Sequence, residues 1–167
     1  IATQGLADLF ASSTVQALAT GAVNGRSVVP RTYNSDIQGG KNRQLVGLMF
    51  GDKGPLSVDA APPYDARFPV SDAQKLSSVD PVSGLLFIAL GETATEAAPC
   101  GANVPVFDGR RRYDMQFTDL GEADVPQSLA TIYTGRARHC RSEMQPIAGF
   151  WRTGNSLNVS RCLSVRP

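Results

Sequence analysis

Short runs of alternating apolar and polar residues, interrupted by glycine and proline, make up most of this chain. Residues 12–37 are rich in Thr, Val and Ala, with turn signals at Gly21 and at Asn24-Gly25. An Asn-Gly pair is a strong hairpin signal because both residues tolerate positive φ. The pattern predicts two strands that meet at Asn24-Gly25.

Two more strands are expected before residue 60. Arg43–Gly51 and Pro55–Asp59 have strand-like patterns, and the turn residues Asp52–Gly54 lie between them. The segment Ala60–Val70 contains three prolines, which cannot donate ladder hydrogen bonds, so it is expected to be a surface loop. The N-terminal part is therefore predicted to be a β meander followed by a loop.

Two short helices are predicted next, over Ser71–Leu76 and Asp80–Leu90. Asp80 is a good N-cap, and Pro81 suits the first helical position. The apolar residues of the second helix are expected to cover one end of a sheet: Leu85, Leu86, Ile88 and Ala89.

A second β block is predicted after Cys100. Val104–Phe107 leads into the turn pair Asp108-Gly109, and Asp119–Gly121 is interpreted as a further turn before strand residues 127–144. In the alternating segment between the two turns, one set of residues is expected to face the core: Arg111, Tyr113, Met115 and Phe117.

Composition supports a globular, mainly β fold. Hydrophobic residues make up 42% of the 167 positions and charged residues 19%, and the 16 Gly and 11 Pro leave no room for long helices. We expect a curved antiparallel sheet or an open or partial β-barrel, with one or two short helices. The whole chain, 1–167, is predicted to be a single domain that is truncated at both ends. Its expected parts are a β meander (1–60), a loop with short helices (61–98), a second β block (99–151) and an irregular tail (152–167).

Charge and motifs exclude several function classes. Because the net charge is only +1, the overall electrostatics of the surface do not favour binding to nucleic acid or to an anionic membrane. The longest apolar run, Leu85–Leu90, is far below the ~20 residues of a transmembrane helix. No hydrolase elbow, phosphate-binding loop or paired histidine ligands occur, so neither a metal nor a cofactor is expected. The single histidine, His139, precedes Cys140 directly, and neighbours on a strand point to opposite faces. Catalytic residues are not expected.

Arginine is the most distinctive chemical feature. If the segments that contain Arg110, Arg112, Arg136 and Arg138 are neighbours, their guanidinium groups could bind a carboxylate or phosphate. The structural interpretation, which we favour, is that these arginines pair with nearby carboxylates across strands. Arg111 would need a partner if it faces the core.

Four segments in order resemble a known family. They are Val79–Leu86, Val106–Asp114, Tyr133–Cys140 and Gln145–Phe150. Together they resemble the bacterial exported proteins of the domain-of-unknown-function family number 3108, over about residues 5–151. The resemblance implies a β-rich exported or periplasmic protein whose signal peptide is removed or absent, with further strands at either end and no assigned catalytic residues.

The family pattern has cysteines at positions that match Cys100 and Cys140. We expect these two to form a disulfide in an oxidising compartment, with a free reactive thiol as the alternative, and Cys162 is left over. The leading hypothesis for function is a non-enzymatic protein that binds an apolar, lipid-like ligand or a protein partner in the cell envelope. The alternative is an anion-binding module or enzyme, centred on the four arginines, for phosphorylated or carboxylated envelope material.

Overall fold

The fold was analysed in a computed structural model of the chain. It describes residues 13–40, 42–63, 67–91, 95, 98, 100–101, 103–125 and 134–150. Its elements, in chain order, are β1 (Ser13–Asn24), β2 (Ser27–Gly39), β3 (Asn42–Gly51), β4 (Gly54–Ala61), α1 (Asp72–Lys75), α2 (Pro81–Leu90), β5 (Val104–Phe107), β6 (Arg112–Asp124) and β7 (Arg136–Ala148). The strands form two antiparallel sheets, in the orders β1-β2-β3-β4 and β5-β6-β7, and this open, mainly β architecture confirms the predicted fold class.

The first sheet is the predicted meander. Asn24 pairs with Ser27, so β1 and β2 are joined by a two-residue loop in which Gly25 has a φ of 63°. The prediction of a turn at Gly21 was wrong. Gly21 lies inside β1 and pairs with Pro30, next to a β-bulge whose extra residue is Arg31 of β2. A Cβ on Gly21 would collide with the backbone carbonyl oxygen of Val29. The glycine marks a close backbone approach within the strand.

Both helices form where the sequence places them, and their caps explain why. In α1, Ser71 and Gln74 form a reciprocal capping box. In α2, Asp80 is the N-cap, Pro81 is at the first helical position, and Gly91 ends the helix in the left-handed conformation.

The predicted apolar face of α2 was wrong. Leu85 and Leu86 are 48% and 40% exposed, and Ala89 is also exposed, although Ile88 is half-buried. The helix instead buries its small residues: a Cβ built on Gly84 would lie 3.3 Å from Cγ2 of Val106. Because the helix backbone packs so closely on β5, the leucines are turned away.

The second sheet contains a long hairpin. β6 and β7 pair from Arg112 opposite Ala148 to Asp124 opposite Arg136. The predicted turn at Asp119–Gly121 was wrong, because β6 continues through it with a register shift between Asp119 and Glu122. Residues 127–133 of the strand predicted at 127–144 lie outside the described residues. The strand β7 begins at Arg136 and continues past residue 144 to Ala148.

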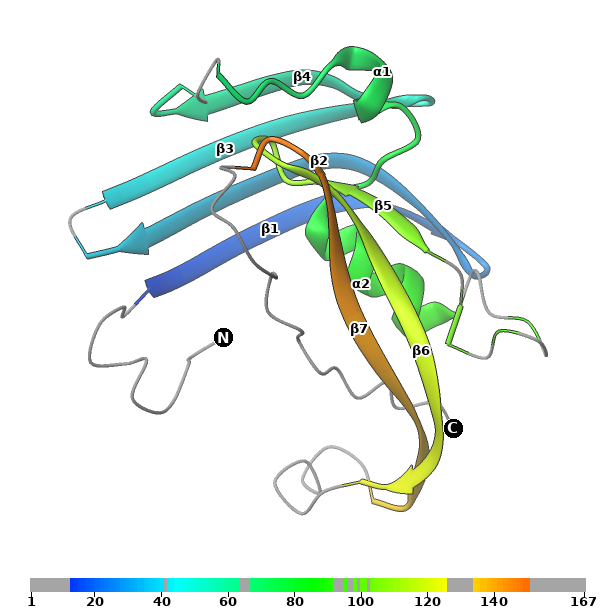
Figure 1. The fold of residues 1–167 in the computed structure, drawn as a ribbon. Coiled ribbons are helices and arrows are strands. Elements are labelled where there is room, and N and C mark those ends of the chain that lie inside the picture. Colours follow the sequence, from blue (N-terminus) through cyan, green and yellow to red (C-terminus); the bar gives the residue numbers. More distant parts are fainter. Residues whose placement is uncertain are drawn as a thin grey trace.

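The core lies between the two sheets. Tyr33, Val46 and Leu48 of the first sheet pack with Val70 and with Phe107 at the end of β5. A second cluster is formed by Val79, Val104, Val106 and Tyr113. Figure 1 shows β6 and β7 running crosswise to the strands of the first sheet, and α2 contacts β1, β2 and β5 on the same side. Only one face of the first sheet is therefore covered by these elements.

Candidate functional site

The first sheet has two faces of different character. The inner face consists of two cross-strand rows: Ala19, Tyr33, Leu48 and Val58 in one, and Ala17, Ser35, Val46 and Ala60 in the other. All of these residues except Ala17, which is exposed on the edge strand, are buried or partly buried. The residues between them point the opposite way and form what we call the outer face. Its two central rows are Leu18, Asn34, Gly47 and Asp59, and Gln16, Asp36, Leu45 and Ala61.

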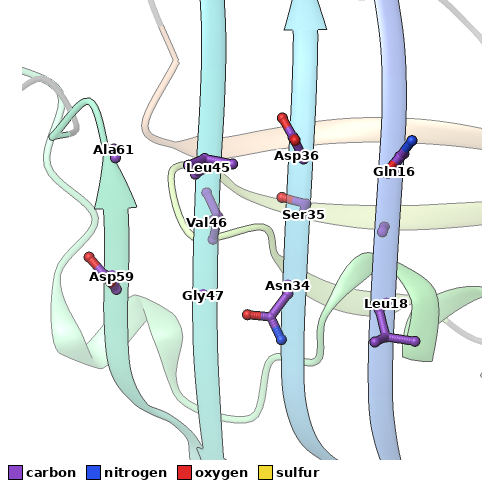
Figure 2. Close-up of a pocket in the computed structure, with 11 residues that line it drawn as sticks. Gln16, Leu18, Asn34, Ser35, Asp36, Leu45, Val46, Gly47, Asp59 and Ala61 are labelled. Carbon is purple, nitrogen blue, oxygen red and sulfur yellow. The ribbon is translucent and has the colours of Figure 1, made fainter.

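The outer face is hollowed at its centre. The eight residues of its two central rows line a groove of about 590 Å³, and Figure 2 shows them on four neighbouring strands. Gly47 forms the floor because it has no side chain: a Cβ built on it would lie 3.4 Å from Oδ1 of Asn34 and 3.9 Å from Cβ of Asp59. Leu18 on β1 and Leu45 on β3 are 65% and 39% exposed.

Charge in the groove is unevenly balanced. Arg43 donates from Nε to Oδ1 of Asp36 at 2.9 Å and from Nη2 to Oδ2 at 2.6 Å. These hydrogen bonds lower the pKa of the Asp36 carboxyl below its ordinary value. Within the described part of the chain, the side chains of Asp59 and Asn34 have no hydrogen bond or ion pair. The groove therefore combines apolar surface with one uncompensated carboxylate and a free amide.

The four arginines proposed from the sequence do not come together. Arg112 is opposite Ala148 at one end of the β6–β7 hairpin, and Arg136 is opposite Asp124 at the other. At about 3.3 Å per residue, the two ends of β6 are on the order of 40 Å apart along the strand. Arg110 lies near the first end and Arg138 near the second, so no single anion could contact all four.

Three of these arginines have carboxylate partners. Arg112 donates from Nη1 to Asp114 at 2.6 Å, and its Nε donates to the backbone carbonyl of Gln74 at 3.0 Å. At the other end, Arg136 Nη2 lies 3.7 Å from Glu122, and Arg138 Nη1 lies 3.2 Å from an oxygen of Asp119. These contacts favour the structural interpretation of the arginine-rich segments.

Arg110 differs from the other three. Its Nη2 donates to the carbonyl oxygen of Pro62 at 2.5 Å, and its Nε is buried and has no hydrogen-bond partner among the described residues. Burial lowers the pKa of this guanidinium, mainly through desolvation.

The turn beside Arg110 joins β5 to β6 in the second sheet and packs against the first sheet. Oδ1 of Asp108 accepts hydrogen bonds from the backbone N–H groups of Arg110 at 2.9 Å and Arg111 at 2.6 Å. Gly109 has a φ of 91°, and a Cβ on it would collide with the side chain of Val46 on the inner face. The turn therefore fits against the sheet only because Gly109 has no side chain.

The prediction that Arg111 faces the core was wrong. Arg111 is exposed and precedes β6, and its Nε donates to Oδ2 of Asp108 at 2.9 Å. Tyr113 is buried as predicted, and Met115 and Phe117 are partly buried against the same cluster. The alternation of side chains between the two faces thus begins with β6 at Arg112, where the turn ends.

The predicted disulfide is confirmed. Cys100 and Cys140 are bonded, with 5.8 Å between their Cα atoms, and both are buried. The bond ties the segment before β5 to β7. Cys162 lies outside the described residues. No group of three or more metal-ligating side chains occurs in the part of the chain that the structure describes. Neither described helix is long and apolar enough to cross a membrane.

Comparison with protein-family models, with curated proteins and with solved structures gave no match for this chain. The resemblance to family number 3108 therefore stays a hypothesis. The groove was not predicted from the sequence. The available signal was Gly47, a glycine inside the alternating run Leu45–Met49, because a glycine in a strand interior often marks a close approach of a ligand or backbone.

Proposed function

We propose that this protein is a non-enzymatic binding protein of the bacterial cell envelope. It takes a lipid-like ligand, an apolar chain with a cationic or hydrogen-bond-donating head group, on the outer face of its first sheet. The observation that carries the proposal is the groove over Gly47, which combines exposed apolar residues with polar groups that have no partner among the described residues.

The apolar half of the groove provides the affinity. Leu18 and Leu45 lie on either side of β2 and remain substantially exposed, while the groove volume falls within the roughly 300–1,000 Å³ range of ligand sites. Covering a half-exposed leucine removes apolar surface from water at about 25 cal/mol per Å². An acyl or alkyl chain laid across the strands would cover both.

The polar half of the groove selects the head group. Because Arg43 already neutralises Asp36, the carboxylate of Asp59 is the uncompensated charge of the groove within the described residues. A cation or an N–H donor beside Asp59 gains a charge-assisted hydrogen bond, whereas an anionic head group is repelled.

Two observations support the proposed envelope location. The buried Cys100–Cys140 disulfide is typical of an oxidising compartment, and the resemblance to exported proteins of family number 3108 points to the same place. The disulfide and the resemblance both concern the location of the protein, and neither depends on the groove.

The experiment is an NMR titration of the oxidised protein with dodecyltrimethylammonium below its micelle concentration. We expect saturable shifts of the amide signals of Leu18, Asn34, Gly47 and Asp59. Dodecyl sulfate, with the same chain and the opposite charge, is the matched ligand control and should bind more weakly. Shifts that map to α2, or equal binding of both detergents with no response at the groove, would contradict the proposal.

The alternative function, anion binding, is favoured by one observation, the unpartnered Nε of Arg110. It predicts that inorganic pyrophosphate shifts the backbone signals of Arg110 and that Arg110→Gln abolishes the effect. If pyrophosphate leaves those signals unchanged at millimolar concentration, this alternative fails.

A further inference from the structure

The free edges of the two sheets are protected to different degrees. On the first sheet, the edge strand β4 contains Pro55 and the charged Asp59. On the second sheet, β5 is four residues long, contains Pro105, and is bridged by Val79. The other edge, β7, carries several charges and Pro146. Proline, charge and short length are the usual means by which proteins prevent unwanted strand pairing.

The edge strand β1 has none of these protections. Its twelve residues, Ser13–Asn24, include no charged residue and no proline. Along the edge, Val15 is 46% exposed and Leu18 is 65% exposed, on opposite faces. Among the residues that the structure describes, no strand pairs with the outer edge of β1. Its backbone groups there can accept another strand, and exposed apolar side chains lie on both faces to pack against it.

We propose that β1 pairs in antiparallel fashion with β1 of a second copy of this chain. The two four-stranded sheets then form one continuous eight-stranded sheet around a two-fold axis. This dimer does not depend on the ligand proposed above.

The sequence of β1 is suited to pairing with itself. In a two-fold antiparallel pair, the residues nearest the axis lie close to their own copies, so a charge in the middle of β1 would meet a charge of the same sign. The absence of charge removes that penalty. The regular part of β1, Ser13–Thr20, ends at the bulge, and Ala17 is one of its two central residues. With the axis at Ala17, Gln16 lies opposite Leu18 of the second copy, and Val15 lies opposite Ala19.

The geometry of the groove points to the same occupant. Gln16 and Leu18 form the wall of the groove on β1, and beyond them the sheet ends at its free edge. A second β1 would extend this wall, and the two grooves would join across the axis into one surface. A copy of the chain supplies a strand of matching length and character.

The experiment is sedimentation velocity on the full, oxidised chain over a range of micromolar concentrations. We expect a species of twice the 17.7 kDa chain mass. The double substitution Gln16→Lys/Leu18→Lys places lysines opposite each other across the axis and should weaken dimerisation at least about tenfold. The matched control is Ser57→Lys, an exposed residue of the opposite edge strand β4, which should leave the dimer intact.

A charge-swap experiment separates loss of pairing from loss of folding. Gln16→Glu/Leu18→Glu should also be monomeric alone, and mixing it with the lysine variant should restore a dimer that contains one of each. A wild-type chain that stays monomeric when its concentration is raised 100-fold above the lowest one measured would overturn the proposal. A dimer that the lysine variant forms as tightly as wild type would overturn it too, because the contact would then lie elsewhere.

Discussion

The inner and outer faces of the first sheet are made by the same four strands and serve different purposes. On β3, Val46 is 6% exposed and packs beneath the Gly109 turn, whereas the preceding Leu45 is 39% exposed and borders the groove. Near the inner face, the carboxylates of Asp108 and Asp80 accept hydrogen bonds from Arg111 and Ser83. On the outer face, Asp59 has no partner among the described residues.

The difference is the reason why we propose the outer face, and not the inner one, as the binding surface. A buried face must satisfy every polar group and fill every space, because unpaired groups and voids there cost stability. An exposed face can keep an open hollow and a free carboxylate at little cost. The distinctive arginine segment belongs to the inner region and the groove to the outer one.

The largest expected effect is on the free energy of unfolding. It appears when glycine is replaced by valine against the inner face and, for comparison, on the outer face. Gly109→Val forces a side chain into Val46 and a branched residue into a φ of 91°, and should lower the free energy of unfolding by about 3 kcal/mol or more. Gly47→Val puts a β-branched residue in a strand, facing the groove, and should change it by less than about 1 kcal/mol. Urea unfolding measures both. Equal losses would mean that the outer hollow is as tightly packed as the inner turn.

A smaller difference is expected between two aspartates. Asp80 is fully buried and accepts hydrogen bonds from the backbone N–H groups of Val82 and Ser83 at 2.9 Å and from the Ser83 hydroxyl at 2.6 Å. Asp80→Ala should therefore cost about 2 kcal/mol of stability. Asp59→Ala, on the outer face, should leave the unfolding midpoint unchanged. If Asp59→Ala destabilised the protein as much as Asp80→Ala, the carboxylate would have a structural role and the comparison would fail.

The smallest effect is a pH dependence of the core. Burial raises the pKa of the Tyr113 phenol above its ordinary value of 10.0, so the folded state holds the proton more tightly than the unfolded chain. The stabilisation is complete below pH 10 and decreases as the pH rises above it, by about 1.4 kcal/mol at about pH 11. Tyr113→Phe should remove this part of the alkaline loss, as measured by unfolding at about pH 9 and about pH 11, while the part due to Tyr33, whose pKa burial also raises, remains. An unchanged slope would show that the phenol is hydrated.

Local rules predicted most of the fold. The Asn24-Gly25 hairpin, the Asp80 cap with Pro81, and the alternation from Tyr113 to Phe117 all depend on neighbours in the sequence, and the structure confirms each of them. The errors concern glycines. Both Gly21 and Gly121 are residues of the type found in turns, yet both lie inside long strands, Gly21 beside a bulge and Gly121 within one. Close backbone approach and positive φ at such irregularities also favour residues without a side chain.

The candidate site could not be predicted because it depends on long-range arrangement. Which face of an alternating strand is covered depends on where β5 to β7 and α2 pack, and no local pattern specifies that. The exposed leucines of α2 show the same limit, because the close approach of Gly84 to Val106 decided the orientation of the helix. The glycine at position 47 was the local signal that could have indicated a hollow.

The most direct test of the outer face as the binding surface is the affinity of the Gly47→Val variant for dodecyltrimethylammonium, measured by the same NMR titration as for the wild type. The side chain added at position 47 fills the floor of the groove without disturbing the core. We predict that binding falls at least about tenfold while the unfolding midpoint stays near that of the wild type. Binding that is unchanged in a folded Gly47→Val protein would contradict the account.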